Sequence, residues 1–170
     1  MDMTDPPPSW LLTRRLMQKK GQRRLFAKLD EARAEFPEFI GRTIKVGVSS
    51  YAEGKAQKDR MAIWLRSREV SLNTVGHELM HLVQGLGSVP SGERSCDVYT
   101  LARSVKFCDS KPYYLKVPRA FIGEDRAIRP SLRIVLHMVA KEAVGRRELG
   151  ERNYITWFEK ELASYAEALL

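Results

Sequence analysis

The chain has 170 residues, of which 44% are hydrophobic and 29% are charged. This composition is typical of a globular protein and excludes a mostly disordered chain, a collagen and a multi-domain assembly. The net charge of +8 favours contact with anions such as nucleic acid, acidic lipid or acidic protein, and a basic surface without a specific partner is an equally good interpretation. We expect a flexible, proline-rich lead-in over residues 1–9 and a single domain over residues 10–170.

The cysteine content and the hydropathy pattern predict a cytoplasmic location. Cys96 and Cys108 are too few for a disulfide framework, so we expect both thiols to be reduced. The N-terminus lacks the basic and apolar regions of a secretory signal. No run of about 18 apolar residues is present, so no membrane span is expected.

Residues 10–36 carry apolar side chains at helical spacing and predict one long helix or two shorter ones, ended by Pro37. This region also holds the densest group of basic residues in the chain. The group is a candidate nucleic-acid contact, although a charged stretch on a helix is more often its solvated face. Its members are Arg14, Arg15, Lys19, Lys20, Arg23, Arg24 and Lys28.

Two strands and two helices are predicted next along the chain. Residues 43–48 alternate and are β-branched, and residues 61–65 form a second candidate strand after a polar loop. Ser71 or Asn73 can cap a helix that runs to about residue 85. A stretch rich in glycine then leads to a second helix, which Ser91 can cap and which reaches about residue 105.

The last third of the chain predicts an irregular segment followed by two helices. Residues 111–125 show no clear periodicity, apart from a candidate short strand at 113–115. Pro130 is suited to the first turn of an apolar helix over residues 131–144. Apolar residues at helical spacing predict a final helix over residues 152–169.

The sequence His77-Glu78-Leu79-Met80-His81 is an H-E-x-x-H motif, and it holds two of the three histidines in the chain. On a helix, positions i and i+4 lie one above the other, so His77 and His81 present two imidazoles that can bind one zinc ion. Glu78 can then reach a water molecule on the open side of the ion and act as a general base. The alternative is a pair of ordinary histidines on a packed helix.

A catalytic zinc ion needs a third protein ligand, and Glu93 is the leading candidate. Glu93 and Asp97 lie four residues apart on the second predicted helix, so both side chains project in one direction. Asp97 can accept the far N–H of a ligating histidine, most plausibly His77, and fix its tautomer. Cys96 is a rival ligand, although a small core residue is the more ordinary role for it.

The motif at residues 77–81, followed by Glu93 and Asp97, resembles the gluzincin zinc metallopeptidases, and its short spacing resembles the compact minigluzincins in particular. In this clan a glutamate on a second helix is the third zinc ligand, and an aspartate follows one turn later. A less complete resemblance is to the SprT-like proteases, which use a third histidine, whereas the remaining histidine here, His137, is distant in sequence. The resemblance implies an α+β fold in which a small, mostly antiparallel sheet packs on the motif helix and on the second ligand-bearing helix, with additional N- and C-terminal helices.

The resemblance also implies how a substrate would bind and react. An extended peptide would add to an edge strand made of Met61, Ala62, Ile63, Trp64 and Leu65. Zinc would activate water for hydrolysis of the peptide bond, and Glu78 would take the proton of that water. A further donor should stabilise the oxyanion, and the candidates are Tyr113, Tyr114 and His137.

Two alternatives to a general peptidase stay open. The first is a regulatory or DNA-associated zinc protease that cleaves one dedicated protein and uses the basic N-terminal residues for contact with DNA. The second is a non-catalytic module in which zinc is structural, which would require a fourth protein ligand such as Cys96 or Cys108.

Overall fold

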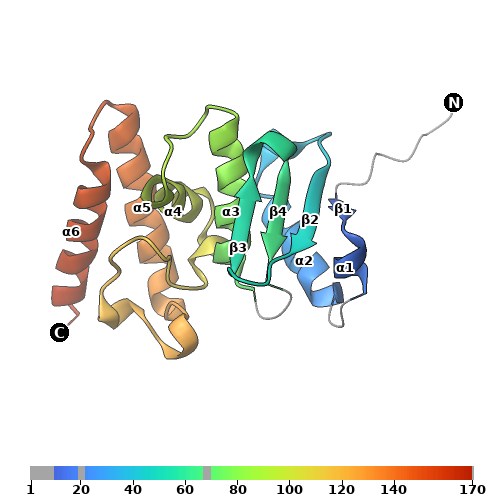
Figure 1. Ribbon diagram of the computed structural model, residues 1–170. Helices are drawn as coiled ribbons and strands as arrows, with labels where there is room; N and C mark the ends of the chain where they lie inside the picture. The colour runs from blue at the N-terminus through green and yellow to red at the C-terminus, as the bar shows by residue number, and fades with distance from the viewer. Residues whose placement is uncertain (1–9, 19–21, 67–69, 170) are drawn as a thin grey trace, which may run out of the picture.

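The computed structural model describes residues 10–18, 22–66 and 70–169 and has an α+β fold (Figure 1). The strands are β1 (Trp10–Leu12), β2 (Ile44–Val48), β3 (Gly54–Gln57) and β4 (Ala62–Leu65). The helices are α1 (Arg14–Met17), α2 (Gln22–Arg33), α3 (Leu72–Gly85), α4 (Glu93–Arg103), α5 (Arg133–Glu148) and α6 (Tyr154–Glu167). The proline-rich lead-in, Lys19 and Lys20 lie outside the described residues.

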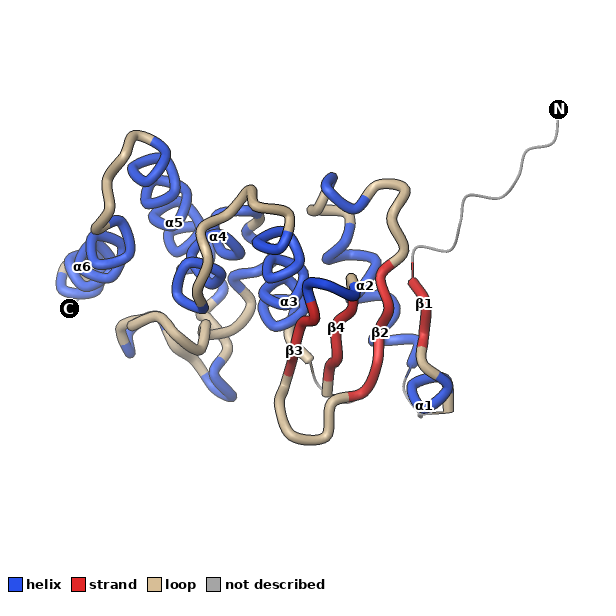
Figure 2. The backbone as a smooth tube through the Cα atoms, turned by 45° about the horizontal axis from the view of Figure 1, so that its top comes forward, coloured by secondary structure: helices blue, strands red, loops and turns tan. Residues whose placement is uncertain are grey.

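The four strands form one mixed sheet in the order β1-β2-β4-β3, and the red segments of Figure 2 follow this order. β1 pairs with β2 and β2 with β4 in parallel, and β3 alone runs antiparallel to its neighbour β4. The expectation of a mostly antiparallel sheet is therefore wrong. β1 and β2 can run parallel because α2 lies in the connection between them. β2 and β4 can run parallel because β3 lies between them in the chain and runs in the opposite direction, which brings the chain back to the end of the sheet where β2 began.

The segment 61–65 was expected to form an edge strand, and this expectation is also wrong. β4 lies between β2 and β3, with Ala62 paired to both Lys45 and Gln57. In the sheet that the described residues form, β3 is the edge next to α3, and β1 is the other edge. Ala62, Ile63 and Leu65 are buried, as suits a strand with neighbours on both sides.

The first hydrophobic core lies between the sheet and the helices α2 and α3. Its largest buried side chains come from both layers and include Leu29, Phe36, Ile63 and Leu79. The expected helix over residues 10–36 is wrong at its start, because Trp10–Leu12 pairs with β2 as a strand. The pairing depends on a partner more than thirty residues away, which the local pattern does not reveal.

The second hydrophobic core lies among α4, α5 and α6, at the end of the molecule opposite β1 (Figure 1). α4 contributes to both cores, since Cys96 belongs to the first and Leu101 to the second. α6 also holds the first turn of α4 through polar contacts. The Tyr154 hydroxyl donates to Ser95 Oγ at 2.8 Å, and Arg94 pairs with Glu159 at 2.7 Å.

The helix α3 begins and ends where the sequence predicts. Ser71 is its N-cap and accepts a hydrogen bond from the Thr74 backbone N–H at 3.0 Å. The Asp109 carboxylate accepts two more of the free backbone N–H groups, from Leu72 at 2.7 Å and from Asn73 at 2.9 Å. Three backbone N–H groups in the first turn of α3 therefore have acceptors within the protein, and the start of α3 is anchored to the segment after α4.

The later helices differ from the predictions at their ends. α4 begins after Gly92, whose φ is 103°, so Ser91 is not its N-cap. The segment 113–115 forms bends and no strand. A 3-10 turn at Pro130–Leu132 precedes α5, which starts at Arg133 and extends to Glu148. Within the described parts of the chain, no helix combines the length and the apolar character that crossing a membrane requires.

Candidate metal centre

The centre is built on α3, which presents His77 and His81 one turn apart. Their ring centroids are 4.6 Å apart and the rings are nearly perpendicular. Both imidazoles are largely shielded from solvent, with 11% and 13% of their side-chain surface exposed. The helix therefore places two nitrogen donors side by side, as the i, i+4 spacing predicts.

Glu93, the first residue of α4, faces both histidines. Its Oε2 lies 3.1 Å from Nε2 of His77 and 3.0 Å from Nε2 of His81. The chain reverses between α3 and α4 through Gly87 and Gly92, whose φ values of 84° and 103° are left-handed. This reversal brings the first turn of α4 against the middle of α3.

The second nitrogen of each imidazole has an acceptor of its own. Nδ1 of His77 lies 2.7 Å from Oδ1 of Asp97, and Nδ1 of His81 lies 2.8 Å from Oε1 of Gln84. Oδ2 of Asp97, a residue only 1% exposed, accepts the backbone N–H of Tyr114 at 2.8 Å. Because a carboxylate only accepts hydrogen bonds, Nδ1 of His77 would donate to Asp97 when a metal ion occupies Nε2.

This donor set fits a divalent cation. The Nε2 atoms of both histidines lie within 3.1 Å of one carboxylate oxygen of Glu93, and two lone pairs directed at that oxygen are repulsive unless a proton or a cation lies among them. A tetrahedral zinc ion separates nitrogen and oxygen ligands by about 3.3 Å. The two nitrogen-to-oxygen distances of 3.1 and 3.0 Å are close to this separation.

A proton is the competing occupant of the centre. Burial alone would lower the pKa of His77, but hydrogen bonds with Asp97 and Cys96 and their charges outweigh it and raise that pKa to about 12. A metal ion has to displace this proton from Nε2, so its affinity should weaken as the solution becomes more acidic.

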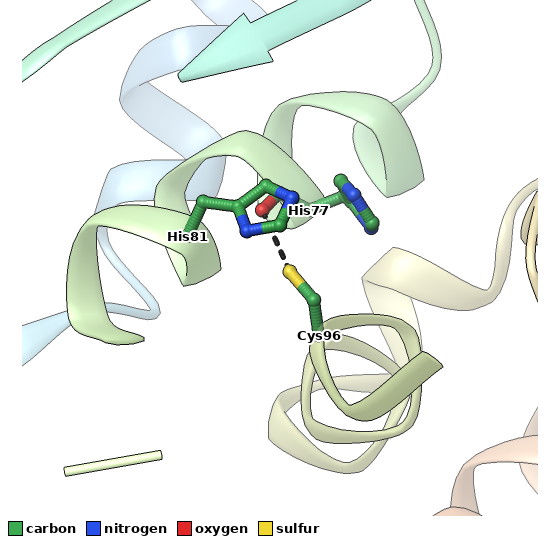
Figure 3. A group of neighbouring side chains, drawn as sticks. All are labelled: His77, His81 and Cys96. Carbon is green, nitrogen blue, oxygen red and sulfur yellow. Dashed lines mark hydrogen bonds between the residues drawn. The ribbon is translucent and has the colours of Figure 1, made fainter. Parts of the chain in front are cut away.

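Cys96 is the second candidate for a third ligand. His77, His81 and Cys96 each offer one donor atom within 4.8 Å of the others, so this group could hold a metal ion. Figure 3 shows the Cys96 side chain reaching from α4 towards α3, with its Sγ directed at the backbone oxygen of His77, 3.2 Å away. Burial raises the pKa of the Cys96 thiol to about 11, so the thiol is protonated at neutral pH. Glu93 approaches both Nε2 atoms directly, and we regard it as the better placed donor.

Glu78 lies beside the two histidines and has an unusual environment. Burial raises the pKa of its carboxyl from 4.5 to about 7, and the nearby His77 partly opposes this. Its Oε2 is buried, and no group of the residues that the structure describes donates a hydrogen bond to it. Its Oε1 packs on Gly54 of β3, where an added Cβ would lie only 2.3 Å away. A carboxyl whose pKa lies near neutral pH and whose Oε2 has no donor among the described residues is suited to proton transfer.

A cavity of about 210 Å³ opens beside Glu78 and His77. Its wall comes from the edge strand β3, the start of α3 and the irregular segment after α4, and it includes Glu53, Gly54, Thr74, Tyr113 and Tyr114. The Tyr114 ring stacks on the His77 imidazole with a centroid distance of 5.9 Å. The cavity therefore adjoins both the donor set and the carboxyl group.

Several of the residues considered in the sequence lie away from this centre. His137 is on α5, where its Nδ1 donates to the Leu101 backbone oxygen at 2.7 Å, so it serves the packing of α5 on α4 and does not line the cavity. Cys108 is buried in the second core, with Sγ 3.9 Å from the same Leu101 oxygen. The described basic residues Arg14, Arg15, Arg23 and Arg24 are exposed on α1 and α2, and Lys28 donates to the Val70 backbone oxygen.

Gln84 and Gly54 belong to this centre and were not found in the sequence. Gln84 lies one turn after His81 on the same helix face, which is a signal that could have been used. Gly54 comes from a strand whose place beside α3 depends on the sheet order, so no local pattern marks it. No family model, no curated protein and no solved structure matches this chain.

Proposed function

We propose that this protein is a zinc-dependent peptidase in which His77, His81 and Glu93 hold the metal and Glu78 is the general base. The observation that carries the proposal is the convergence of three donor atoms beside Glu78, whose buried Oε2 has no hydrogen-bond partner among the described residues. Glu93 Oε2 lies within 3.1 Å of both Nε2 atoms, and Glu78 adjoins them with a pKa of about 7. When bound, zinc supplies a Lewis acid that polarises a peptide carbonyl and acidifies a water molecule.

The residues of the chain would divide the remaining work. Glu78 takes the proton of the attacking water and delivers it to the leaving amine, which is possible in both directions because its pKa lies close to neutral. Asp97 holds His77 in the tautomer that leaves Nε2 free, through the 2.7 Å hydrogen bond at Nδ1. Glu93 completes the set of three ligands, and with 48% of its side chain exposed it is the most solvent-accessible of the three.

An extended peptide substrate would pair with β3, which replaces residues 61–65 in this role. β3 is the sheet edge beside α3, and its first residue, Gly54, touches the Glu78 carboxyl. A peptide added to this edge would pass over the donor set, and one of its side chains could enter the cavity. Tyr114 is the better candidate for the oxyanion donor, because Tyr113 already shares a hydrogen bond with Glu53.

The test combines metal content with cleavage of a peptide library. We expect one equivalent of zinc in the wild type, retention of zinc with loss of cleavage in Glu78→Gln, and loss of zinc in Glu93→Ala. Glu167→Gln, an exposed change on α6, is the control and should behave like the wild type. Cleavage that persists in Glu78→Gln would refute the assigned base, and full zinc content in Glu93→Ala would refute the ligand set.

A second candidate function, a non-catalytic metal-binding module, is favoured by the position of Cys96. A structural site has four protein ligands, and the Cys96 sulfur lies within 4.8 Å of the histidine donors. In that case the cobalt-loaded protein would show an intense sulfur-to-metal absorption band, and Cys96→Ala would lose the metal. We expect neither result if the metal is catalytic.

A further inference from the structure

Gln84 makes three close hydrogen bonds that connect one proposed metal ligand to the backbone leading to another. Its Oε1 lies 2.8 Å from Nδ1 of His81, and its Nε2 donates to the backbone oxygens of Pro90 at 2.7 Å and Gly92 at 3.0 Å. The residue is only 8% exposed, so water does not compete strongly for these contacts. Glu93 follows Gly92 directly in the chain.

The chemistry of these partners fixes the orientation of the amide. The backbone oxygens of Pro90 and Gly92 can only accept hydrogen bonds, so they must face the NH₂ group of Gln84. Its oxygen is then the atom that faces His81, and it can only accept. Nδ1 of His81 must therefore donate, and in the neutral imidazole this leaves Nε2 as a lone pair directed at Oε2 of Glu93, 3.0 Å away.

The same side chain also restrains the connection between α3 and α4. This connection contains Gly87 and Gly92 in left-handed conformations, and glycine by itself does little to restrict the backbone because it has no side chain. Both hydrogen bonds from the Gln84 NH₂ group end on the last residues before Glu93. The position of the Glu93 carboxylate is thus tied to the orientation of the His81 ring.

We propose that Gln84 is a positioning residue of the metal centre, which sets the tautomer of His81 and the approach of Glu93 through a single amide. The inference rests on the proposed metal site. It also implies that the two histidines are supported differently, His77 by a carboxylate and His81 by a neutral amide. The charges of Glu93 and Asp97 then balance those of one divalent ion without a further carboxylate.

The test is the titration of metal-free protein with zinc and with cobalt, in the wild type and in two variants. Gln84→Leu removes all three hydrogen bonds, and we expect zinc affinity to fall about 10- to 100-fold, as for other outer partners of metal ligands. Gln84→Glu keeps an acceptor for His81 but sets a carboxylate oxygen against the two backbone oxygens, so its zinc affinity should also fall below that of the wild type. Lys58→Met is the matched control, because Lys58 makes only a 3.4 Å contact with Oε1, and its affinity should stay within about twofold of the wild type.

Two spectroscopic readings separate positioning from general stability. The visible spectrum of the cobalt-loaded protein should change in Gln84→Leu and not in Lys58→Met, because it reports ligand geometry. In the zinc-loaded wild type, the His81 Nδ1 proton should exchange slowly with water and give a nuclear magnetic resonance signal that Gln84→Leu lacks. If Gln84→Leu does not fold, Gln84→Glu supplies the zinc affinity and the cobalt spectrum, and its His81 Nδ1 proton signal should remain because the acceptor is kept.

Gln84→Leu that binds zinc within twofold of the wild type, with an unchanged cobalt spectrum, would overturn this inference and leave the proposed peptidase intact. A wild type that binds no zinc would instead refute the metal site and, with it, both proposals.

Discussion

Replacing Gly54 with alanine is the change that tests most sharply how the edge strand and the general base work together. The new Cβ would lie 2.3 Å from Oε1 of Glu78, 2.7 Å from its Cγ and 2.8 Å from its Cδ. Ordinary contact begins near 3.4 Å, so the carboxyl group has to move by about 1 Å. The end of a flexible side chain can make this movement, and the strand itself can stay in place.

The expected magnitude follows from the role of that carboxyl group. A displacement of about 1 Å can reduce a rate about 100-fold, and loss of a general base costs about 100- to 10,000-fold. We therefore expect kcat to fall by about 100-fold or more in Gly54→Ala. Zinc content should be unchanged because none of the three proposed ligands touches Gly54. Stability should change by no more than about 1 kcal/mol, since alanine is favoured over glycine in a strand.

The assay is cleavage of the best peptide from the library, measured beside zinc content and urea unfolding. Lys55→Ala is the control, because Lys55 is the next residue on β3 and its side chain is exposed. The double variant Gly54→Ala/Glu78→Gln should be no slower than Glu78→Gln alone, since both changes disable the same group. A Gly54→Ala enzyme with kcat within threefold of the wild type would show that the position of Glu78 against β3 has no catalytic consequence.

Three further predictions concern the metal, the pH dependence and the stability of the fold. Asp97→Asn should weaken zinc binding about 10- to 100-fold, measured by titration of the metal-free protein, and an unchanged affinity would exclude Asp97 as a support of His77. The raised pKa of Glu78 means that the folded state holds this proton more tightly than the unfolded state, so the contribution of Glu78 to stability should be complete below pH 4.5 and be lost as the pH rises to about 7. The loss should be about 3 kcal/mol for metal-free wild type relative to Glu78→Gln in urea unfolding, and equal pH profiles would contradict it. Arg103→Ala should cost about 1–3 kcal/mol, because its guanidinium binds Glu38 at 2.6 and 3.0 Å and joins α4 to the segment after α2, and a melting temperature equal to that of the wild type would argue against this.

The local part of the centre could be predicted from the sequence, because helical spacing alone brings His77 beside His81 and Glu93 beside Asp97. The structure places these pairs opposite each other, although their roles as ligands stay a prediction. The order of the strands could not be predicted in the same way. Pairing of Trp10–Leu12 with β2, and burial of residues 61–65 between two neighbours, depend on contacts between distant parts of the chain.

The outer parts of the centre show the same limit. Gln84 is close to His81 in sequence, but its contacts with Pro90 and Gly92 exist only once the connection between α3 and α4 has folded. His137 shows the reverse case: its residue type suggested a function, and its hydrogen bond to Leu101 gives it a role in packing. A histidine is informative here when a second donor lies one helical turn away.

The contacts of α6 with the first turn of α4 limit how this protein can be shortened or redesigned. Tyr154 donates a hydrogen bond to Ser95, and Glu159 pairs with Arg94. Arg94 and Ser95 are the two residues between Glu93 and Cys96 in the chain. A truncated version that stops before residue 154 would remove the outer brace of the turn that carries the carboxylate donor, even though every residue of the H-E-x-x-H helix would remain. Engineering of the C-terminal helices is thus a route to tuning the metal centre from a distance, and fusion or deletion at this end should be judged first by metal retention.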